Sequence, residues 1–175
     1  VACPSCQQSV TPPPPQIAPG VTLGNFLIER RLGRGAMGDV FLALQLSMDR
    51  RVALKVLPQA LTREARIIAR FRREVRMSAR LEHPNIVKVD DFGNHDGRYW
   101  LRMELAEGGD VDGKHVRSLQ EYADAKDGRL DPEEALVVFT EILEGLAHAH
   151  AHGTVHRDLK PANILICTDA DSNAT

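Results

Sequence analysis

A cluster of polar residues between two apolar runs constrains this chain more than any other feature. Residues 156–163 read His-Arg-Asp-Leu-Lys-Pro-Ala-Asn, and they follow an apolar helical pattern and precede the apolar run at 164–166. Buried elements on both sides would hold such a loop rigidly, as catalysis requires. Asp158 and Asn163 lie five residues apart, which suits neither a strand face nor a helix face. We therefore expect a folded loop that brings their oxygens to one point, where a metal ion or a hydroxyl could bind.

The composition is that of an ordinary soluble globular protein. Hydrophobic residues make up 43% of the chain and charged residues 26%, and the formal net charge is −2. This balance gives no reason to expect a nucleic-acid partner. There is no run of about eighteen apolar residues and no signal-peptide pattern at the N-terminus. We expect a cytoplasmic chain without a membrane segment.

The N-terminal residues fall into two segments. Cys3 and Cys6 have the spacing of one knuckle of a zinc ribbon, because two thiolates on a tight turn supply half of a tetrahedral Zn²⁺ site. The other half would have to lie elsewhere; otherwise the pair is unliganded in a flexible tail. A zinc-ribbon interaction protein is therefore one alternative function. After this candidate knuckle at 1–10, the proline-rich residues 11–21 predict an extended linker.

A glycine-rich turn follows at the start of the folded part. Strand patterns at 26–32 and 39–46 flank Gly33-Arg34-Gly35-Ala36-Met37-Gly38. Because this run leads into a strand rather than a helix, it does not fit a dinucleotide-binding fingerprint. We expect the glycines at the tip of a hairpin, where backbone N–H groups can approach phosphates closely. The plain alternative is a flexible hairpin.

The next strand and helix carry an unusual pair of charges. Residues 51–57 alternate so that Lys55 lies between apolar neighbours on one face of a strand. A helix is expected at 62–81, and Glu74 interrupts its apolar stripe. A local pair with Arg70 is one interpretation. We instead expect Glu74 to pair with Lys55, because a buried ammonium needs an anionic partner.

The second half of the chain predicts two more strands and two helices. Strand patterns at 86–92 and 98–105 meet at a hairpin turn, and the polar residues 108–116 suggest a flexible connection. A short helix is expected at 118–125. A longer core helix should run from Pro132 to about His152, with a capping box at its start and Gly153 at its end.

Taken in order, these motifs resemble those of bacterial eukaryotic-like Ser/Thr protein kinases. The Gly-rich loop reads G-x-G-x-x-G-x-V up to Val40, and Val52-Ala53-Leu54-Lys55, Met103–Ala106 and residues 156–163 follow in the family's order. The resemblance implies an α+β protein-kinase fold with a five-stranded antiparallel N-lobe sheet and one helix, αC, at 22–106. The first helices and the catalytic loop of an incomplete helical C-lobe would occupy 107–175.

The resemblance also implies ATP and Mg²⁺ as cofactors and protein Ser or Thr hydroxyls as acceptors. Asp158 would orient the acceptor hydroxyl, Lys160 would neutralise charge on the transferred group, and Asn163 would bind Mg²⁺. Lys55, steadied by Glu74, would hold the nucleotide phosphates. The remaining residues implied in nucleotide binding are Leu32, Gly33, Gly35, Gly38, Val40, Ala53, Glu104, Ala106 and Leu165.

The resemblance stops after the catalytic loop. Protein kinases carry Asp-Phe-Gly and an activation loop beyond the position of Asn163, and none follows it in these 175 residues. We therefore predict little or no kinase activity from this stretch alone and an active full-length parent. The alternative is a pseudokinase or a nucleotide-binding regulatory module. The presence of Lys55, Asp158 and Asn163 argues against it, because pseudokinases usually lack at least one of these residues. Arg157 and Lys160 disfavour a small-molecule phosphotransferase.

Overall fold

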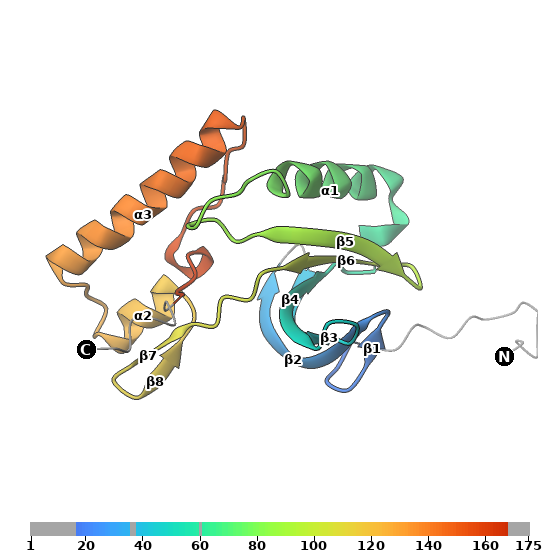
Figure 1. Ribbon diagram of the computed structural model, residues 1–175, viewed down its shortest axis with the longest axis horizontal. Coiled ribbons are helices and arrows are strands. Elements are labelled where there is room, and N and C mark those ends of the chain that lie inside the picture. Colours follow the sequence, from blue (N-terminus) through green and yellow to red (C-terminus); the bar gives the residue numbers. More distant parts are fainter. Residues whose placement is uncertain (1–16, 36–37, 60, 168–175) are drawn as a thin grey trace, which may run out of the picture.

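A computed structural model describes residues 17–35, 38–59 and 61–167, without the side chains of Arg63 and Glu74. The predicted zinc knuckle, Cys3 and Cys6 included, lies outside these residues. Figure 1 shows a strongly curved sheet with the helix α1 across it, and beside them a smaller part with the helices α2 and α3. No helix among the described residues is long and apolar enough to cross a membrane.

The sheet is antiparallel and has the strand order β1-β2-β3-β4-β6-β5. The five predicted strands are confirmed, with β5 starting three residues later than expected, and a sixth, β1, adds a short edge. Hairpins join β2 to β3 and β5 to β6, as the turn residues predict. The strands are β1 (Thr22–Leu23), β2 (Phe26–Gly35), β3 (Gly38–Gln45), β4 (Arg50–Val56), β5 (Val89–His95) and β6 (Arg98–Met103).

The two faces of the sheet have different cores. On the face away from α1, the alternate β4 residues Val52, Leu54 and Val56 are almost fully buried with Phe26 and other strand residues. On the opposite face, Val75 of α1 packs with Val89 and Leu101. The period-two pattern of β4 is thus confirmed, and it places Lys55 on the α1 side of the sheet.

The helix α1 (Ala65–Ser78) is shorter than the 62–81 that the sequence predicts. A separate 3₁₀ turn, η1 (Leu61–Arg63), precedes it. At the other end, the amides of Arg80 and Leu81 donate to carbonyls three residues back, which tightens the last turn. The prediction was too long because helix-forming composition does not reveal where α-helical bonding gives way to 3₁₀ turns.

The connection at 108–116 has regular secondary structure, which the sequence analysis did not predict. It forms a hairpin of β7 (Gly109–Val111) and β8 (Lys114–Val116). Its turn residues, Asp112 and Gly113, have φ angles of +49° and +76°. An Asp-Gly pair is a strong signal for such a two-residue turn.

The second part continues with α2 (Leu119–Ala125), α3 (Pro132–Ala151) and the 3₁₀ turn η2 (Pro161–Asn163). The predicted start of α3 is confirmed, because Asp131 and Glu134 form a capping box with Pro132 at the first position. The chain leaves the helix through Gly153 at φ +70°, as expected of a glycine just after a helix.

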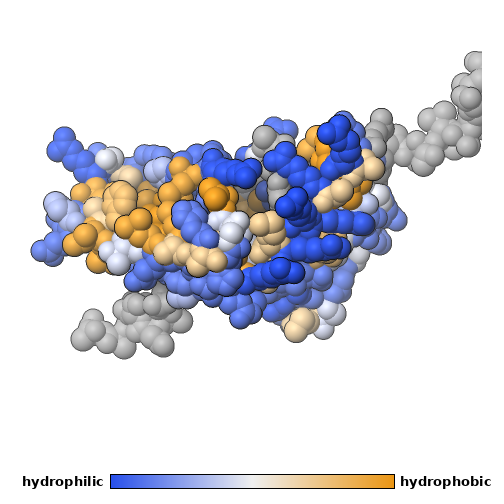
Figure 2. Space-filling view, turned by 90° about the horizontal axis from the view of Figure 1, so that it is seen from above, coloured by the Kyte–Doolittle hydropathy of each residue, from blue (hydrophilic) through white to orange (hydrophobic). Residues whose placement is uncertain are grey.

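The expectation that α3 is a core helix fails for the described residues. Only its small residues Gly145 and Ala149 are buried. Leu136, Phe139 and Leu143 are 69%, 63% and 61% exposed, because no described element lies over that side of the helix. Figure 2 shows apolar surface gathered at the end of the molecule that carries α3.

Candidate active site

The loop between α3 and η2 brings Asp158, Lys160 and Asn163 together. The amide Nδ2 of Asn163 donates to the Asp158 carbonyl at 2.8 Å and to its carboxylate Oδ2 at 3.0 Å. The Lys160 Nζ lies 3.0 Å from the same Oδ2. The loop can make these contacts because Pro161 starts the η2 turn, which folds Asn163 back over Asp158. The loop thus brings the two residues together as expected, but through the Asn163 nitrogen rather than its oxygen.

The carboxyl group of Asp158 is ionised at neutral pH. Its pKa is lowered first by the hydrogen bond from Lys160 and then by that from Asn163. The carboxylate is nevertheless exposed, with 68% of its side chain accessible. A charged, accessible and oriented oxygen of this kind can accept a hydrogen bond or a proton from an incoming hydroxyl.

Asn163 suits a cation through its other side-chain atom. Because Nδ2 is engaged with Asp158, Oδ1 remains to act as a ligand, and amide oxygens are suitable ligands for Mg²⁺. Among the described residues, no group of three or more His, Cys, Asp or Glu side chains could hold a metal. A cation here would need further oxygen ligands from outside this loop.

The β2–β3 hairpin carries the three glycines of the Gly-rich motif. Gly38 has φ +123°, and a Cβ there would lie 2.2 Å from the Val56 carbonyl oxygen. Only glycine fits this approach of the hairpin to β4. A Cβ on Gly33 would meet nothing within 4 Å, so its backbone is open on one side. Leu32, half-buried, precedes it, and Ala36 and Met37 lie outside the described residues.

Lys55 shares its sheet face with two other predicted nucleotide-binding residues. It pairs in register with Val40 on one side and with Leu101 on the other, and Ala53 lies two positions before it. Residues directly opposite one another in a sheet project to the same face. Lys55 lines a cavity of about 180 Å³ between β4 and α1, together with Leu57, Phe71, Val75 and Leu101. Glu74 lies on α1, but its side chain is not described, so the Lys55–Glu74 pair stays a prediction.

The segment after β6 carries the backbone groups of Glu104 and Ala106, for which the sequence predicts adenine binding. The Glu104 N–H donates to the Lys88 carbonyl at 2.9 Å. Among the backbone hydrogen bonds of the described segments, none uses the Glu104 carbonyl or the N–H of Ala106. Ala106 is only 8% exposed. A planar ligand with one donor and one acceptor could form hydrogen bonds with these two backbone groups.

The sheet residues and the loop residues remain two separate groups. Within the described part of the chain, no hydrogen bond or ion pair joins residues 156–163 to the Gly-rich hairpin or to Lys55. Leu165 forms a bridge with Ser118 and so belongs to the second part. It is 43% exposed.

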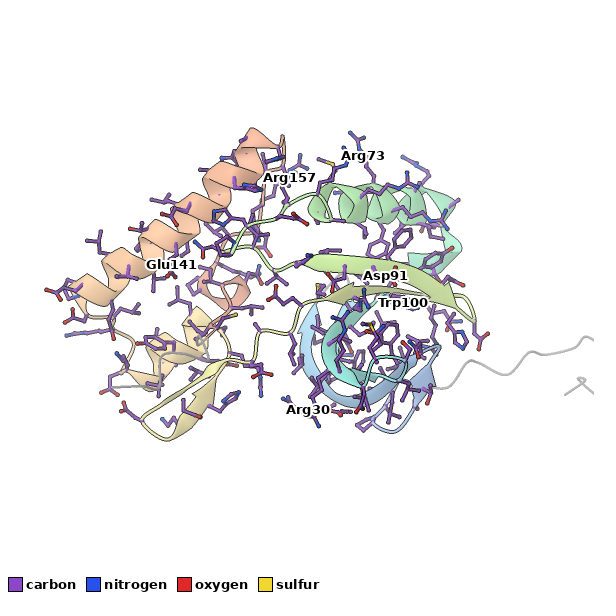
Figure 3. All side chains as sticks on the ribbon, viewed as in Figure 1. Arg30, Arg73, Asp91, Trp100, Glu141 and Arg157 are labelled. Carbon is purple, nitrogen blue, oxygen red and sulfur yellow. The ribbon has the colours of Figure 1, made fainter. Side chains whose placement is uncertain are left out.

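An Asp-Phe-Gly tripeptide does occur in the chain, at 91–93, but it belongs to the sheet. It lies in β5, where Asp91 is opposite Arg102 and Gly93 is opposite Trp100. Figure 3 shows Asp91 and Trp100 on the sheet below α1. A Cβ on Gly93 would lie 2.3 Å from the Trp100 ring. This glycine is therefore required by packing, and the tripeptide is no part of the 156–163 loop.

A contact between the two parts of the molecule was missed by sequence reasoning. Asn85, in the segment between α1 and β5, donates from Nδ2 to the Glu141 carbonyl of α3 at 2.9 Å. A Cβ on Gly145 would lie 3.0 Å from the Asn85 carbonyl oxygen. The one available signal was Gly145 itself, because an isolated glycine inside a helix often marks a close backbone approach.

Histidines complete this contact. The rings of His83 and His148 have centroids 5.1 Å apart, and those of His148 and His152 are 4.4 Å apart. The Nε2 of His148 is buried without a hydrogen-bond partner. Burial lowers the pKa of His148 first, and the charges of His152 and His83 lower it further.

Comparisons with known proteins identify the family of the chain. The model of the protein kinase domain matches residues 26–173. The chain is 42% identical to the serine/threonine-protein kinase PrkC of Bacillus subtilis over 143 residues, which cover 82% of this chain and 21% of PrkC. It is 38% identical to the serine/threonine-protein kinase PknJ of Mycobacterium tuberculosis over 152 residues, covering 86% of this chain and 24% of PknJ.

A solved kinase domain shares the fold. The crystal structure of the PknI kinase domain of Mycobacterium tuberculosis superimposes with a TM-score of 0.68 at 35% identity, over 86% of this chain and 59% of that domain. The chain thus spans less than a quarter of the length of the two curated relatives and over half of a solved kinase domain. It belongs to the protein kinase family, like the bacterial serine/threonine-protein kinases that it resembles.

Proposed function

We propose that the kinase to which this chain contributes transfers the γ-phosphoryl group of ATP to Ser or Thr hydroxyls of protein substrates. The observation that carries the proposal is the Asp158 carboxylate, which Lys160 and Asn163 hold at 3.0 Å each. Little covalent chemistry is required of the protein in phosphoryl transfer, so positioning and electrostatics supply most of the acceleration. A fixed, ionised and accessible carboxylate provides the positioning of the acceptor hydroxyl.

In this proposal, the sheet binds the nucleotide. Backbone N–H groups around Gly33, Gly35 and Gly38 cover the phosphates, and Lys55 pairs with the α- and β-phosphates while Glu74 steadies it. The open backbone at Gly33 and the tight approach of Gly38 to Val56 support this role. The adenine is enclosed by Leu32, Val40, Ala53 and Leu165 and bonded by the Glu104 carbonyl and the Ala106 N–H.

The loop in turn binds the acceptor. Asp158 accepts the hydrogen bond of the Ser or Thr hydroxyl and takes its proton as transfer proceeds. The depressed pKa of Asp158 keeps it anionic before the reaction, so it acts mainly by orienting the hydroxyl. Lys160 lies close enough to Asp158 to neutralise negative charge on the transferred phosphoryl group. Asn163 would hold Mg²⁺ through Oδ1; when bound, the ion neutralises phosphate charge.

These 175 residues alone are proposed to transfer phosphate slowly or not at all. The family places a metal-binding Asp-Phe-Gly after the catalytic loop, and none follows Asn163 in this stretch. Asp91-Phe92-Gly93 cannot replace it, because it is fixed in β5 by pairing with Arg102 and Trp100. Without the aspartate of that Asp-Phe-Gly, part of the electrostatic stabilisation that dominates this reaction would be lost.

The test is the transfer of labelled phosphate from ATP to a generic basic protein, measured for the complete kinase and for residues 1–175. We expect activity in the complete kinase only. Asp158→Asn should lower its rate by about 10²–10⁴-fold, and Lys55→Met should abolish nucleotide-dependent transfer.

The Asp-Phe-Gly in β5 provides a matched control. Asp91→Asn makes the same chemical change as Asp158→Asn and should leave the rate of the complete kinase within about twofold. Equal losses from both substitutions would contradict the assignment of the loop. Nucleotide binding without any transfer by the complete kinase would instead support a regulatory module.

A further inference from the structure

The outward side of α1 carries a concentrated positive surface. Four guanidinium groups gather there, and with Ala69 and Met77 they line a hollow of about 390 Å³. Arg72, Arg73 and Arg76 lie on α1, and Arg80 follows in the turn just after the end of the helix. We call this surface the α1 arginine face; its residues are Ala69, Arg72, Arg73, Arg76, Met77 and Arg80.

The arginines of this face have no acidic partners among the described residues. With the side chains that the structure describes, Arg73, Arg76 and Arg80 form no salt bridge or side-chain hydrogen bond, whereas arginines of the sheet pair with Asp39, Glu29 and Asp90. Arg72 contacts only the ring of Tyr99, with 5.8 Å from its Cζ to the ring centroid. The next acidic residue along the chain, Glu82, is paired with Lys88 at 3.8 Å.

This arrangement is unfavourable in the absence of an anion. Like charges four residues apart on a helix repel one another, and Arg72 and Arg76 have this spacing on α1. Arg80 adds a further positive charge to the same hollow. The net charge of −2 for the whole chain means that the positive potential is local to the face. A bound anion would remove the repulsion.

We propose that the α1 arginine face binds a segment of a partner protein that carries phosphoserine or phosphothreonine. The planar guanidinium fork matches phosphate oxygens with two parallel hydrogen bonds, and several forks around one hollow can share a dianion. Ala69 and Met77 supply apolar contact for a peptide backbone or side chain beside the phosphate. The choice of phosphorylated protein as the partner rests on the proposed function, because that activity generates such segments.

A membrane surface fits the face less well. Helices that lie on membranes carry large apolar side chains beside their basic ones. The large exposed apolar residues among the described ones lie near the β3–β4 turn, on α3 and around the 156–163 loop, and none lies on α1. Figure 2 shows strongly hydrophilic side chains over α1 and apolar surface over α3.

The experiment measures binding by the 175-residue chain, using fluorescence anisotropy of a labelled peptide that contains two phosphothreonines. The comparison ligands are the unphosphorylated peptide, vesicles of phosphatidylcholine and phosphatidylserine, and a short DNA duplex. We expect the phosphopeptide to bind at least about tenfold more tightly than the unphosphorylated peptide, because charge-assisted hydrogen bonds replace neutral ones.

Two triple variants distinguish binding by the α1 arginine face from nonspecific binding by positive charge. Arg73→Gln/Arg76→Gln/Arg80→Gln should weaken phosphopeptide binding by at least about tenfold. The control Arg30→Gln/Lys114→Gln/Arg129→Gln removes the same charge from exposed positions elsewhere and should change binding less than about twofold. Replacing the same three face arginines by lysine keeps the charge but removes the fork, and should give an intermediate loss.

The proposal is overturned if the face variant binds like the wild type while its thermal unfolding is unchanged. It is also overturned if both triple variants lose affinity equally, or if vesicles or DNA bind more tightly than the phosphopeptide through the same arginines. The assay requires no phosphoryl transfer, so Asp158→Asn should bind the phosphopeptide normally. A failure of binding and a failure of the proposed kinase activity are therefore distinguishable.

Discussion

The two long helices present opposite surfaces to the exterior. The helix α1 buries Val75 against Val89 and Leu101 on its inner side and carries arginines on its outer side. The helix α3 buries only Gly145 and Ala149 and leaves Leu136, Phe139 and Leu143 more than half exposed. Figure 1 shows the two helices on the same side of the molecule.

The difference separates a helix whose packing is complete from one whose packing is not. An amphipathic helix with polar residues outward needs no further partner, whereas a helix that is apolar on several sides is normally buried on all of them. The chain covers 59% of the solved kinase domain that it resembles. We therefore expect further protein over α3 in the complete kinase, and none to be required over α1 for folding.

The strongest test of this comparison is Phe139→Ala, made in the 175-residue chain and in the complete kinase domain. In the short chain, where this ring is 63% exposed, the free energy of unfolding should change by at most about 0.5 kcal/mol. In the complete domain, the loss should be about 3–5 kcal/mol, as for a buried phenylalanine. Urea denaturation measures both, and Glu141→Gln serves as a surface control. Equal effects in the two chains would remove the distinction between the helices.

The next test compares the two sides of α1 at adjacent positions. Val75 is 5% exposed, so Val75→Ala should lower the free energy of unfolding by about 2 kcal/mol through lost burial and a residual cavity. Arg76→Ala, on the outer side, should change it by no more than about 0.5 kcal/mol. A larger loss at Arg76 would mean that the arginine face has a structural role that the contacts do not reveal.

A smaller effect is expected at the start of α3. Asp131 accepts a hydrogen bond from the Glu133 N–H at 2.9 Å, so Asp131→Ala should cost about 1 kcal/mol. Asp131→Asn retains an acceptor and should cost much less. If alanine and asparagine were equivalent, the capping box would contribute nothing, and the position of α3 would depend on its packing alone.

The smallest effect concerns pH at the contact between α3 and Asn85. The pKa of His148 in the folded state lies below its ordinary value of 6.5, so the unfolded chain binds more protons as the pH falls through about 6.5. Stability should therefore decrease on acidification in this range and level off below the folded-state pKa. Thermal unfolding between about pH 8 and about pH 5.5 measures the slope.

His148→Gln should reduce this pH slope, although the rings of His83 and His152 also contact His148. His150→Gln, at an exposed position of the same helix, should leave it unchanged. A slope that responds to His150 instead would show that the buried nitrogen of His148 is not its source.

Local patterns predicted much of this molecule because their causes are local. The alternation of residues 51–57 gave the face on which Lys55 lies, since side chains alternate along any strand. Asp131, Pro132 and Glu134 gave the start of α3 because capping involves only the first turn. The hairpin at 109–116 could also have been predicted, from Asp112-Gly113 alone.

Other features depend on residues distant in sequence, and no local pattern contains them. The Asn85 contact joins residues 56 positions apart, and its geometry follows from how α3 packs. The exposure of Phe139 and Leu143 could not be predicted either, because their apolar character specifies burial without specifying what covers them. Of the candidate site, the closeness of Asp158 and Asn163 was predicted, whereas the pairing of Lys55 with Glu74 stays a prediction.

The hydrogen bonds from Asn163 to Asp158 have a consequence for motion. Both residues belong to one short loop and are tied to each other at 2.8 and 3.0 Å, so their separation does not depend on how the sheet is oriented. If the two parts of the molecule open and close during a reaction cycle, the acceptor-orienting carboxylate and the amide travel as one rigid body. Hinge movement would then change the position of that body relative to Lys55 on β4 without changing the Asp158–Asn163 contact.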